Sequence, residues 1–246
     1  MKVIFIAAGY GSRLKQGIPK PLVEVNGSSI LQRQILLFQK YGIDDIIIIV
    51  GPEKEKFKLK NVRYIHDVYF DTHEQLGSLM AAKSEINDDV IILFADILFD
   101  EQILDQLLQS TSDIGIALDL DWKKSYLERI DNSSSDADKI LVKNNKIIKL
   151  SKNIDSHKIG EDTGEFLGLL KLSKHGSKIF VEMYDKLIET HSGKFHESDS
   201  INNSKLLDFL QEISQSNFKL TPIIIKGKWC EIDTPLDLER AKKMFV

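Results

Sequence analysis

The chain has 246 residues, of which 42% are hydrophobic and 28% are charged, as in an ordinary folded protein and unlike a disordered or collagen-like chain. Its formal net charge of −4 excludes the basic footprint that non-specific nucleic-acid binding needs, so we expect no nucleic-acid partner. The single cysteine, Cys230, can form neither an intrachain disulfide nor a zinc site by itself, and we expect a buried structural thiol.

The first element is an apolar run over Lys2–Ala7. It is far shorter than a secretory signal or a membrane span, so we expect a cytoplasmic protein without membrane contact. A continuous apolar run followed by glycines is typical of a strand that is buried on both faces of a parallel sheet. The run therefore predicts the first strand of such a sheet.

Strands and helices then alternate along the chain. Apolar spacing predicts an amphipathic helix over Ser29–Tyr41, with a serine as N-cap, and Gly42 ends it before a β-branched strand over Asp45–Gly51. The later expected elements are strands at 62–65, 89–94 and 220–225 and helices at 77–86, 176–190, 204–212 and 235–245. Such alternation implies parallel strands with right-handed crossovers and ligands bound beyond their carboxyl ends.

The composition changes between Asp119 and Gly164, where two alternating segments, 139–142 and 146–150, flank Asn144-Asn145. This pattern predicts an antiparallel hairpin inserted on one side of the sheet. The expected fold class is therefore α/β, a Rossmann-like, mixed and mostly parallel sheet flanked by helices, with a small antiparallel hairpin insertion. At this length we expect one domain over 1–246, with residues 118–172 as an insertion within it.

The strongest chemical signal is the glycine-rich loop that follows the first strand. Its glycines let the backbone approach a triphosphate, and its N–H groups can form an anion-binding concavity. It is neither a dinucleotide-binding fingerprint, because the third glycine is missing, nor a P-loop, because no Gly-Lys-[Ser/Thr] follows. Arg13 and Lys20 add two cations that can neutralise triphosphate charge; the alternative is a turn-forming loop with surface cations. The loop reads Ala7-Ala8-Gly9-Tyr10-Gly11-Ser12-Arg13, and Pro19-Lys20 follows it.

This loop resembles the G-x-G-x-R…P-K signature of nucleotidyltransferases that activate sugar phosphates and phosphocholine-type compounds. The resemblance extends over nearly the whole chain and implies a GT-A-like nucleotidyltransferase fold. In that family the glycine loop and its arginine bind the phosphates, and the lysine of the Pro-Lys pair contacts the α-phosphate in the transition state. The resemblance thus makes Arg13 and Lys20 catalytic and gives nucleotide binding to 7–12.

A second segment, Gln75-Leu76-Gly77-Ser78, resembles the Gln-x-Gly-[Ser/Thr] segment that embraces the nucleobase and ribose in this family. Gly77 would let a flat base lie against the backbone, while Gln75 and Ser78 could supply hydrogen bonds. Ser78 as a helix N-cap is the alternative, and both interpretations can hold together.

Two aspartates form the expected metal site. Asp96 follows the buried strand that ends at Phe94, and Asp233 lies between a strand and the terminal helix. Mg²⁺ takes hard oxygen ligands, commonly one or two carboxylates plus phosphate oxygens, and the resemblance matches the family's metal aspartates to these two positions. For Asp233 the alternative is an N-cap of the terminal helix, and Asp100 is interpreted as a helix start rather than a ligand.

The insertion at 118–172 and the segment before the terminal helix are expected to bind the acceptor. Aromatic rings with acidic neighbours suit a cationic ammonium group, although the tryptophans could equally be core residues and Lys152 part of a solvated face. The candidate acceptor residues are Trp122, Lys152, Glu165, Trp229 and Glu231. The six histidines show no metal-binding spacing, and none is assigned a role.

The segments Asp-Trp-Lys-Lys-x-Tyr and Gly-Glu-Phe-x-Gly resemble those of cytidylyltransferases for small phospho-compounds. The resemblance implies a Mg²⁺-dependent transfer from CTP to a phosphorylated or phosphonate acceptor such as phosphocholine, aminoethylphosphonate or a phospho-amino acid, in surface polysaccharide or phosphonate biosynthesis. A sugar-1-phosphate uridylyl- or thymidylyltransferase and a non-catalytic nucleotide-binding regulatory subunit remain alternatives. A dehydrogenase is disfavoured, because no acidic residue ends the second strand. The sequence leaves open whether the chain forms a homodimer.

Overall fold

The structure is a computed structural model, and it describes all residues except 10–13, 15–16, 127–134, 136, 155–159 and 217. Its centre is a nine-stranded sheet in the order β10-β9-β11-β6-β1-β4-β5, with β8 joined to β11 and β12 joined to β8. The strands are β1 (Lys2–Ala7), β4 (Ile46–Val50), β5 (Arg63–His66), β6 (Val90–Phe94), β8 (Ile114–Asp119), β9 (Lys139–Lys143), β10 (Lys146–Ser151), β11 (Glu161–Leu172) and β12 (Leu220–Ile224).

The sheet is mixed, as the sequence predicted. The four strands expected in the first part of the chain are parallel: β1 pairs with both β4 and β6, and β5 pairs with β4. The long strand β11 runs antiparallel to β6, β8 and β9, and it joins this parallel half to the rest of the sheet. Neither β8 nor β11 was predicted from the sequence, because their pairing partners are distant in the chain.

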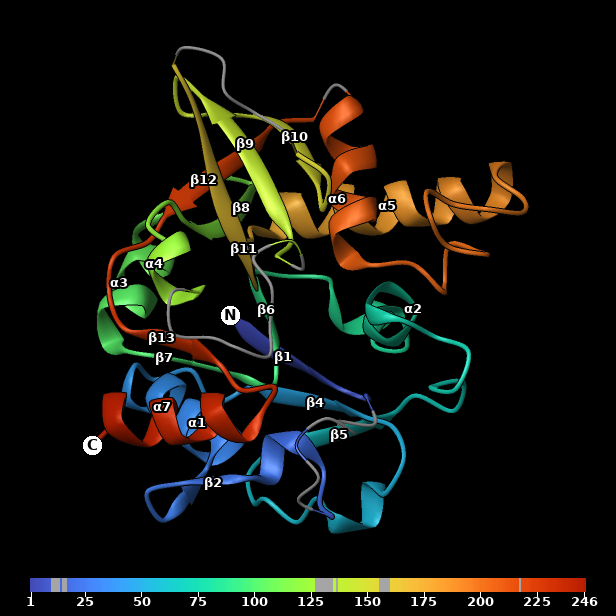
Figure 1. The fold of residues 1–246 in the computed structure, drawn as a ribbon. Helices are drawn as coiled ribbons and strands as arrows, with labels where there is room; N and C mark the ends of the chain where they lie inside the picture. Colours follow the sequence, from blue (N-terminus) through green and yellow to red (C-terminus); the bar gives the residue numbers. More distant parts are fainter. Residues whose placement is uncertain (10–13, 15–16, 127–134, 136, 155–159, 217) are drawn as a thin grey trace.

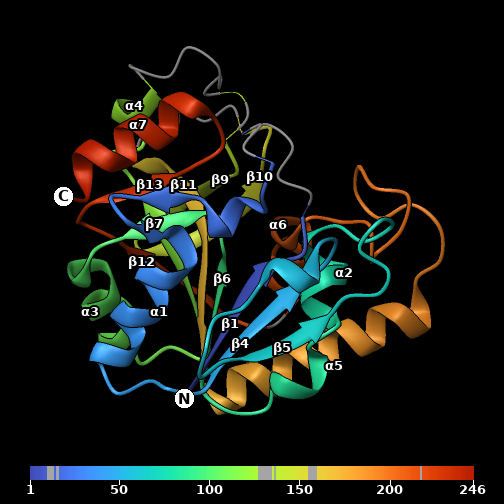
Figure 2. The same ribbon diagram turned by 90° about the horizontal axis from the view of Figure 1, so that it is seen from below.

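Helices cover both faces of the sheet (Figures 1 and 2). On one face α2, α5 and α6 pack against apolar side chains of β1 and β6, and on the other face α1 and α3 do so. A third apolar cluster lies under α7. The helices are α1 (Ile30–Lys40), α2 (Gln75–Met80), α3 (Glu101–Gln109), α4 (Lys123–Tyr126), α5 (Lys174–Thr190), α6 (Leu206–Gln215) and α7 (Pro235–Met244).

The helix ends follow local capping chemistry. The Ser29 side chain accepts from the Gln32 N–H at the start of α1, and the Asp100 side chain accepts from the Ile103 N–H at the start of α3, as predicted. The helix predicted at 77–86 differs from the observed one at both ends. Helix α2 begins at Gln75 and ends at Met80, and a separate 3-10 turn, η4 (Lys83–Glu85), follows it.

The predicted hairpin is present as β9 and β10. Asn144 and Asn145 connect the two strands with φ angles of 50° and 57°, which asparagine tolerates and which a two-residue hairpin turn needs. Since β9 also pairs with β11, the hairpin extends the edge of the main sheet and does not form a separate layer.

Two small two-stranded sheets lie outside the main sheet. Strand β7 (Ile97–Phe99) pairs antiparallel with β13 (Trp229–Glu231), while β2 (Glu24–Val25) pairs with β3 (Ser28–Ser29). Cys230 lies in β13 and is buried, as expected. In the part of the chain that the structure describes, no helix is both long and apolar enough to cross a bilayer.

Gly168 interrupts the register of β11 between Phe166 and Leu170. Its φ is +69°, and an added Cβ would lie 2.0 Å from the Phe94 ring. We therefore expect Gly168→Ala to lower the free energy of unfolding by about 3 kcal/mol, because left-handed backbone and an overfilled site each cost about 1–3 kcal/mol.

Gly193 provides the matched control, because its φ is +83° but nothing lies within 4 Å of its Cβ position. Gly193→Ala should lose only about 1 kcal/mol, the backbone contribution alone. Urea unfolding measures both variants, and equal losses would show that the Phe94 ring gives way without cost.

Candidate active site

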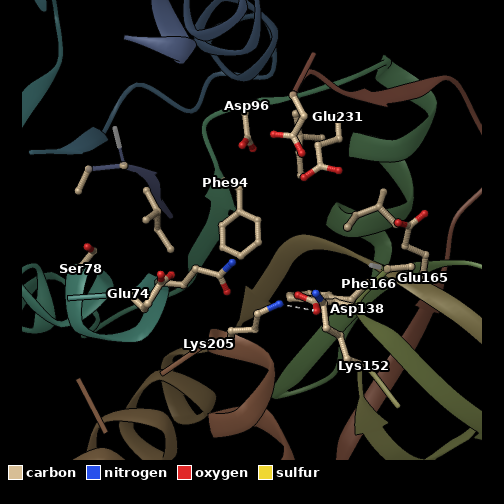
Figure 3. A pocket seen from close by; sticks show the side chains of 18 of the residues that line it. Glu74, Ser78, Phe94, Asp96, Asp138, Lys152, Glu165, Phe166, Lys205 and Glu231 are labelled. Carbon is tan, nitrogen blue, oxygen red and sulfur yellow. Dashed lines mark hydrogen bonds and ion pairs between the residues drawn. The ribbon is translucent and has the colours of Figure 1, made fainter. Parts of the chain in front are cut away.

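A cleft of about 690 Å³ opens at the carboxyl ends of β1 and β6. Its lining comes from segments that are far apart in the chain: the glycine loop, the start of α2, the end of β6, the hairpin region, β11, the start of α6 and β13. Figure 3 shows Asp96 and Glu231 at one end, Lys205, Asp138 and Lys152 at the other, and the Phe94 ring between them. The position agrees with the rule that ligands bind beyond the carboxyl ends of parallel strands.

Three carboxylates meet at one end of this cleft. Asp96 follows β6, and β7 starts immediately after it; Ile97 is paired with Glu231 on β13. The Ile232 N–H donates to the Asp96 carbonyl at 3.0 Å, which holds the following Asp233 beside Asp96. Oxygens of Asp96, Glu231 and Asp233 lie within 4.8 Å of one another. The predicted pair of aspartates is thus brought together, and Glu231, which the sequence assigned to the acceptor, joins them.

Lys20 lies between the two aspartates. Its Nζ is 2.7 Å from Asp96 Oδ2 and also contacts Asp233 Oδ1, and its side chain is about one-tenth exposed. Burial by itself would lower the pKa of Lys20, but the charges and hydrogen bonds of the two carboxylates outweigh burial and raise the pKa above its ordinary value of 10.5. Lys20 is therefore a fully charged ammonium at neutral pH.

The turn η2 (Lys20–Leu22) places this lysine. Pro19 precedes it in extended geometry, and Pro21 is its second residue, so the backbone on both sides of Lys20 is restricted. Asp233 is not the N-cap of α7: Thr234 caps that helix, accepting from the Asp237 N–H, so the N-cap interpretation of Asp233 is wrong. The Asp233 carboxylate contacts Lys20 instead.

The three carboxylates have the donor set that a divalent cation takes. They supply hard oxygen atoms from neighbouring strands, and Asp96 Oδ1 is buried without a hydrogen-bond partner among the described residues. A buried, unsatisfied carboxylate oxygen is costly unless a ligand satisfies it. A cation bound here would compete with the Lys20 ammonium for the same oxygens.

The glycine loop reaches the cleft through Ala8 and Gly9, which are among its lining residues. Ala7 is the buried last residue of β1. The predicted nucleotide-binding residues Tyr10, Gly11 and Ser12 and the predicted catalytic Arg13 lie outside the described residues.

Of the second predicted nucleotide-binding segment, Gln75 and Ser78 line the cleft, whereas Leu76 and Gly77 do not. Ser78 lies inside α2, so it is not the N-cap of that helix. Gln75 Oε1 accepts from the Leu206 N–H at 3.1 Å. A Cβ on Gly77 would lie 2.3 Å from the Asn202 carbonyl, so the glycine is needed where α2 packs against the loop before α6.

Sequence reasoning missed Asp67, which anchors this side of the cleft. Asp67 follows β5, is 1% exposed, and accepts hydrogen bonds from Ser78 Oγ at 2.8 Å and the Tyr69 N–H at 3.0 Å. His73 Nδ1 lies 2.9 Å from the same carboxylate, and His73 and Ser78 both line the cleft. The position of Asp67 directly after a parallel strand was the signal that could have identified it.

Apart from Glu231, which lies with the two aspartates, the predicted acceptor residues separate into two groups. Lys152, Glu165 and Trp229 line the cleft; the Trp229 indole donates to Asp119 Oδ2 at 2.9 Å, and Tyr126 donates to Glu165. Trp122 does not line the cleft: it is 3% exposed, and its indole donates to the Thr163 carbonyl at 2.9 Å. The burial of Trp122 agrees with its interpretation as a core residue, while its assignment to the acceptor stays a prediction.

Two further charged residues that the sequence did not single out face the cleft. Lys205 Nζ lies 2.9 Å from Asp138 Oδ1, and the side chains are 36% and 14% exposed. Lys205 stands at the start of α6 and Asp138 immediately before β9. No local pattern marks either residue, since a lysine beside a helix and an aspartate beside a strand are usually solvated surface residues.

Residues 3–121 match the family model of the MobA-like NTP transferase domain. The chain is a nucleotidyltransferase. The CTP:phosphoglutamine cytidylyltransferase of Campylobacter jejuni is 28% identical over 97% of this chain and 98% of its own length. The choline-phosphate cytidylyltransferase of Streptococcus pneumoniae is 36% identical over 45% of this chain and 52% of its own length. The inositol-1-phosphate CTP transferase structure from T. maritima superposes with a TM-score of 0.73 at 17% identity, covering 99% of this chain and 95% of that one.

The Lys20 ion pair makes a direct prediction about the nucleotidyltransferase's stability. In the presence of a chelator, Lys20→Met should lower the free energy of unfolding by about 3 kcal/mol, because it leaves the buried Asp233 and the partly buried Asp96 carboxylates without their cation. Since the pKa of Lys20 is raised above 10.5, this difference from wild type should persist from neutral pH to about 10.5 and shrink only above it.

Lys40→Met is the matched control, because Lys40 pairs with Glu101 at 2.6 Å on the exposed surface. It should cost less than about 1 kcal/mol at any of these pH values. Urea unfolding of both variants and wild type as a function of pH tests the prediction. A Lys20→Met loss no larger than that of the control would show that the buried pair is not stabilising.

Proposed function

We propose that the enzyme transfers the cytidylyl group of CTP, with Mg²⁺, to a small phosphorylated or phosphonate acceptor. It releases pyrophosphate and forms a CDP-linked product from a phosphate, or a CMP-linked product from a phosphonate. The single observation that carries the proposal is the position of Lys20 between Asp96 and Asp233, in a cleft that also exposes Glu231. A fixed ammonium beside a cation-binding set of carboxylates is suited to stabilising phosphate charge during transfer.

The chemistry needs little more than positioning. The acceptor's phosphate or phosphonate oxygen is anionic at neutral pH, so no general base is needed to form the nucleophile. The oxygen attacks the α-phosphorus in line; one O–P bond forms, the bond between the α-phosphorus and the bridging oxygen breaks, and the electron pair leaves with pyrophosphate. Lys20 stabilises charge at the α-phosphate, as the family resemblance implies. Mg²⁺ held by Asp96 and Asp233 would neutralise charge on the triphosphate.

The two sides of the cleft support a division between the two substrates. Ala8, Gly9, Gln75 and Ser78 come from the segments that resemble the family's nucleotide-binding motifs, and Asp67 holds the second of these segments in place. Lys152, Glu165 and Trp229 line the other side. We assign the first side to CTP and the second to the acceptor, with transfer beside Lys20.

The choice of CTP is supported by relatives whose names specify CTP or cytidylyl transfer. A sugar-1-phosphate uridylyl- or thymidylyltransferase is the main alternative within the enzyme class. A non-catalytic nucleotide-binding subunit is less well supported, because a protein that only binds would not need Lys20 together with both aspartates.

Turnover of four nucleoside triphosphates against phosphocholine, 2-aminoethylphosphonate, O-phosphoserine and glucose 1-phosphate tests base and acceptor together, with pyrophosphate release as the readout. We expect the highest kcat/KM with CTP and a non-sugar acceptor. Activity restricted to glucose 1-phosphate with UTP or dTTP would favour the sugar enzyme. CTP binding without turnover on any acceptor would favour the regulatory subunit.

Lys20→Ala tests the assigned catalytic role. It should reduce kcat about 10²–10³-fold, the usual cost of losing one group that stabilises developing charge, while the far-UV circular dichroism spectrum stays native. Lys40→Ala, which removes an exposed ammonium, should keep wild-type turnover. Near wild-type turnover of Lys20→Ala would remove the lysine from the mechanism.

A further inference from the structure

The end of the cleft away from the three carboxylates has a charge pattern of its own. Lys205 and Asp138 form an ion pair there, with Lys152 nearby on the same side (Figure 3). The Phe94 ring lies between this pair and the Asp96–Glu231 end, so the pair does not belong to the proposed metal site. The catalytic chemistry derived above uses neither Lys205 nor Asp138.

Main-chain hydrogen bonds hold both residues of the ion pair in place. The Asp138 carbonyl accepts from the Phe166 N–H at 2.8 Å, which ties Asp138 to β11. The Lys205 N–H donates to Asp208 Oδ2 at 3.3 Å in the first turn of α6. Both side chains are partly exposed and line the cleft, so a bound molecule can reach the ammonium and the carboxylate together.

Charged groups of both signs line this side of the cleft. Among the described residues they are the lysines Lys152 and Lys205 and the acids Glu74, Asp138 and Glu165 (Figure 3). A quaternary ammonium group would meet ammonium groups of like charge, and a simple anion would meet carboxylates, so each would bind with a repulsive contact. A tail with one positive and one negative group can pair with both signs.

Aromatic side chains that line the cleft also suit an acceptor with such a tail. Phe94 and Phe166 pack edge to face, with ring centroids 6.2 Å apart, and both line the cleft. They offer an apolar surface for a short carbon chain between the reacting phosphate and the charged tail. Trp122, which an aromatic cage for choline would have used, is buried outside the lining.

We propose that the acceptor is a phosphorylated amino acid, and that Lys205 binds its α-carboxylate while Asp138 binds its α-ammonium group. Lys205 and Asp138 thereby select the acceptor class. The inference rests on the proposed cytidylyl transfer and narrows its acceptor from small phospho-compounds in general to those with a zwitterionic end.

Matched pairs of acceptors test it. O-Phospho-L-serine differs from 2-aminoethyl phosphate only by a carboxylate, and O-phospho-L-homoserine differs from 3-aminopropyl phosphate in the same way. With CTP and Mg²⁺, the carboxylated member of at least one pair should have a kcat/KM at least about tenfold higher, the contribution of one charge-assisted hydrogen bond. Its kcat/KM should also exceed those of phosphocholine and glucose 1-phosphate.

Lys205→Met should erase the preference for the carboxylated member by raising its KM, while the KM for CTP and the kcat at saturating acceptor stay close to wild type. Asp138→Asn should raise the KM of both members of a pair, because both keep the ammonium group. Lys149→Met, on the exposed side of β10, is the matched control and should change none of these constants. A merely structural role of Lys205 would lower kcat or the unfolding midpoint without changing the ratio within a pair.

The outcomes separate this inference from the function on which it rests. Turnover of phosphocholine, an amine or glucose 1-phosphate that equals or exceeds that of the amino acids overturns the zwitterionic acceptor and leaves nucleotidyl transfer intact. A preference that survives in Lys205→Met overturns the role of that lysine. Pyrophosphate release with none of these acceptors, while CTP still binds, overturns the proposed function itself.

Discussion

The contact of one lysine with two aspartates is the interaction on which the candidate site depends. Lys20 lies 76 residues before Asp96 and 213 before Asp233, yet its ammonium contacts both carboxylates in a mostly buried position. Two carboxylates so close together repel each other unless a cation lies between them. The Lys20 ammonium offsets this repulsion where the β7–β13 pair and the η2 turn bring the segments together.

The same constraint connects folding to function. A group that neutralises the aspartates in the free protein is also the group that the proposed reaction needs at the α-phosphate. Nucleotide and divalent cation would offer the lysine and the carboxylates new partners of opposite charge, so the site can exchange one set of charge contacts for another. Such a fixed arrangement of charges lowers the reorganisation that the transfer step requires.

Two different structural supports hold the two sides of the cleft. The side assigned to CTP depends on the buried carboxylate of Asp67, which binds Ser78 and His73 and so fixes α2 against the end of β5. The side assigned to the acceptor depends on the antiparallel strands β9 and β11 and on the start of α6. Since β11 also pairs with β6, these strands connect the acceptor side directly to the parallel half of the sheet.

The sequence by itself determined the parallel half of the fold, the glycine loop and the aspartate after β6, because these depend on local patterns: continuous apolar runs, glycine positions, and a polar residue just after a buried strand. Tertiary structure alone decided that Glu231 joins the aspartates, that Trp122 is buried, that Ser78 binds Asp67, and that Lys205 and Asp138 face the cleft. Most of these results depend on pairing between distant segments, above all β7 with β13 and β11 with its three neighbours, whereas the Ser78–Asp67 contact joins the end of β5 to α2. The immediate sequence neighbours of a residue do not indicate which distant segment its side chain will contact.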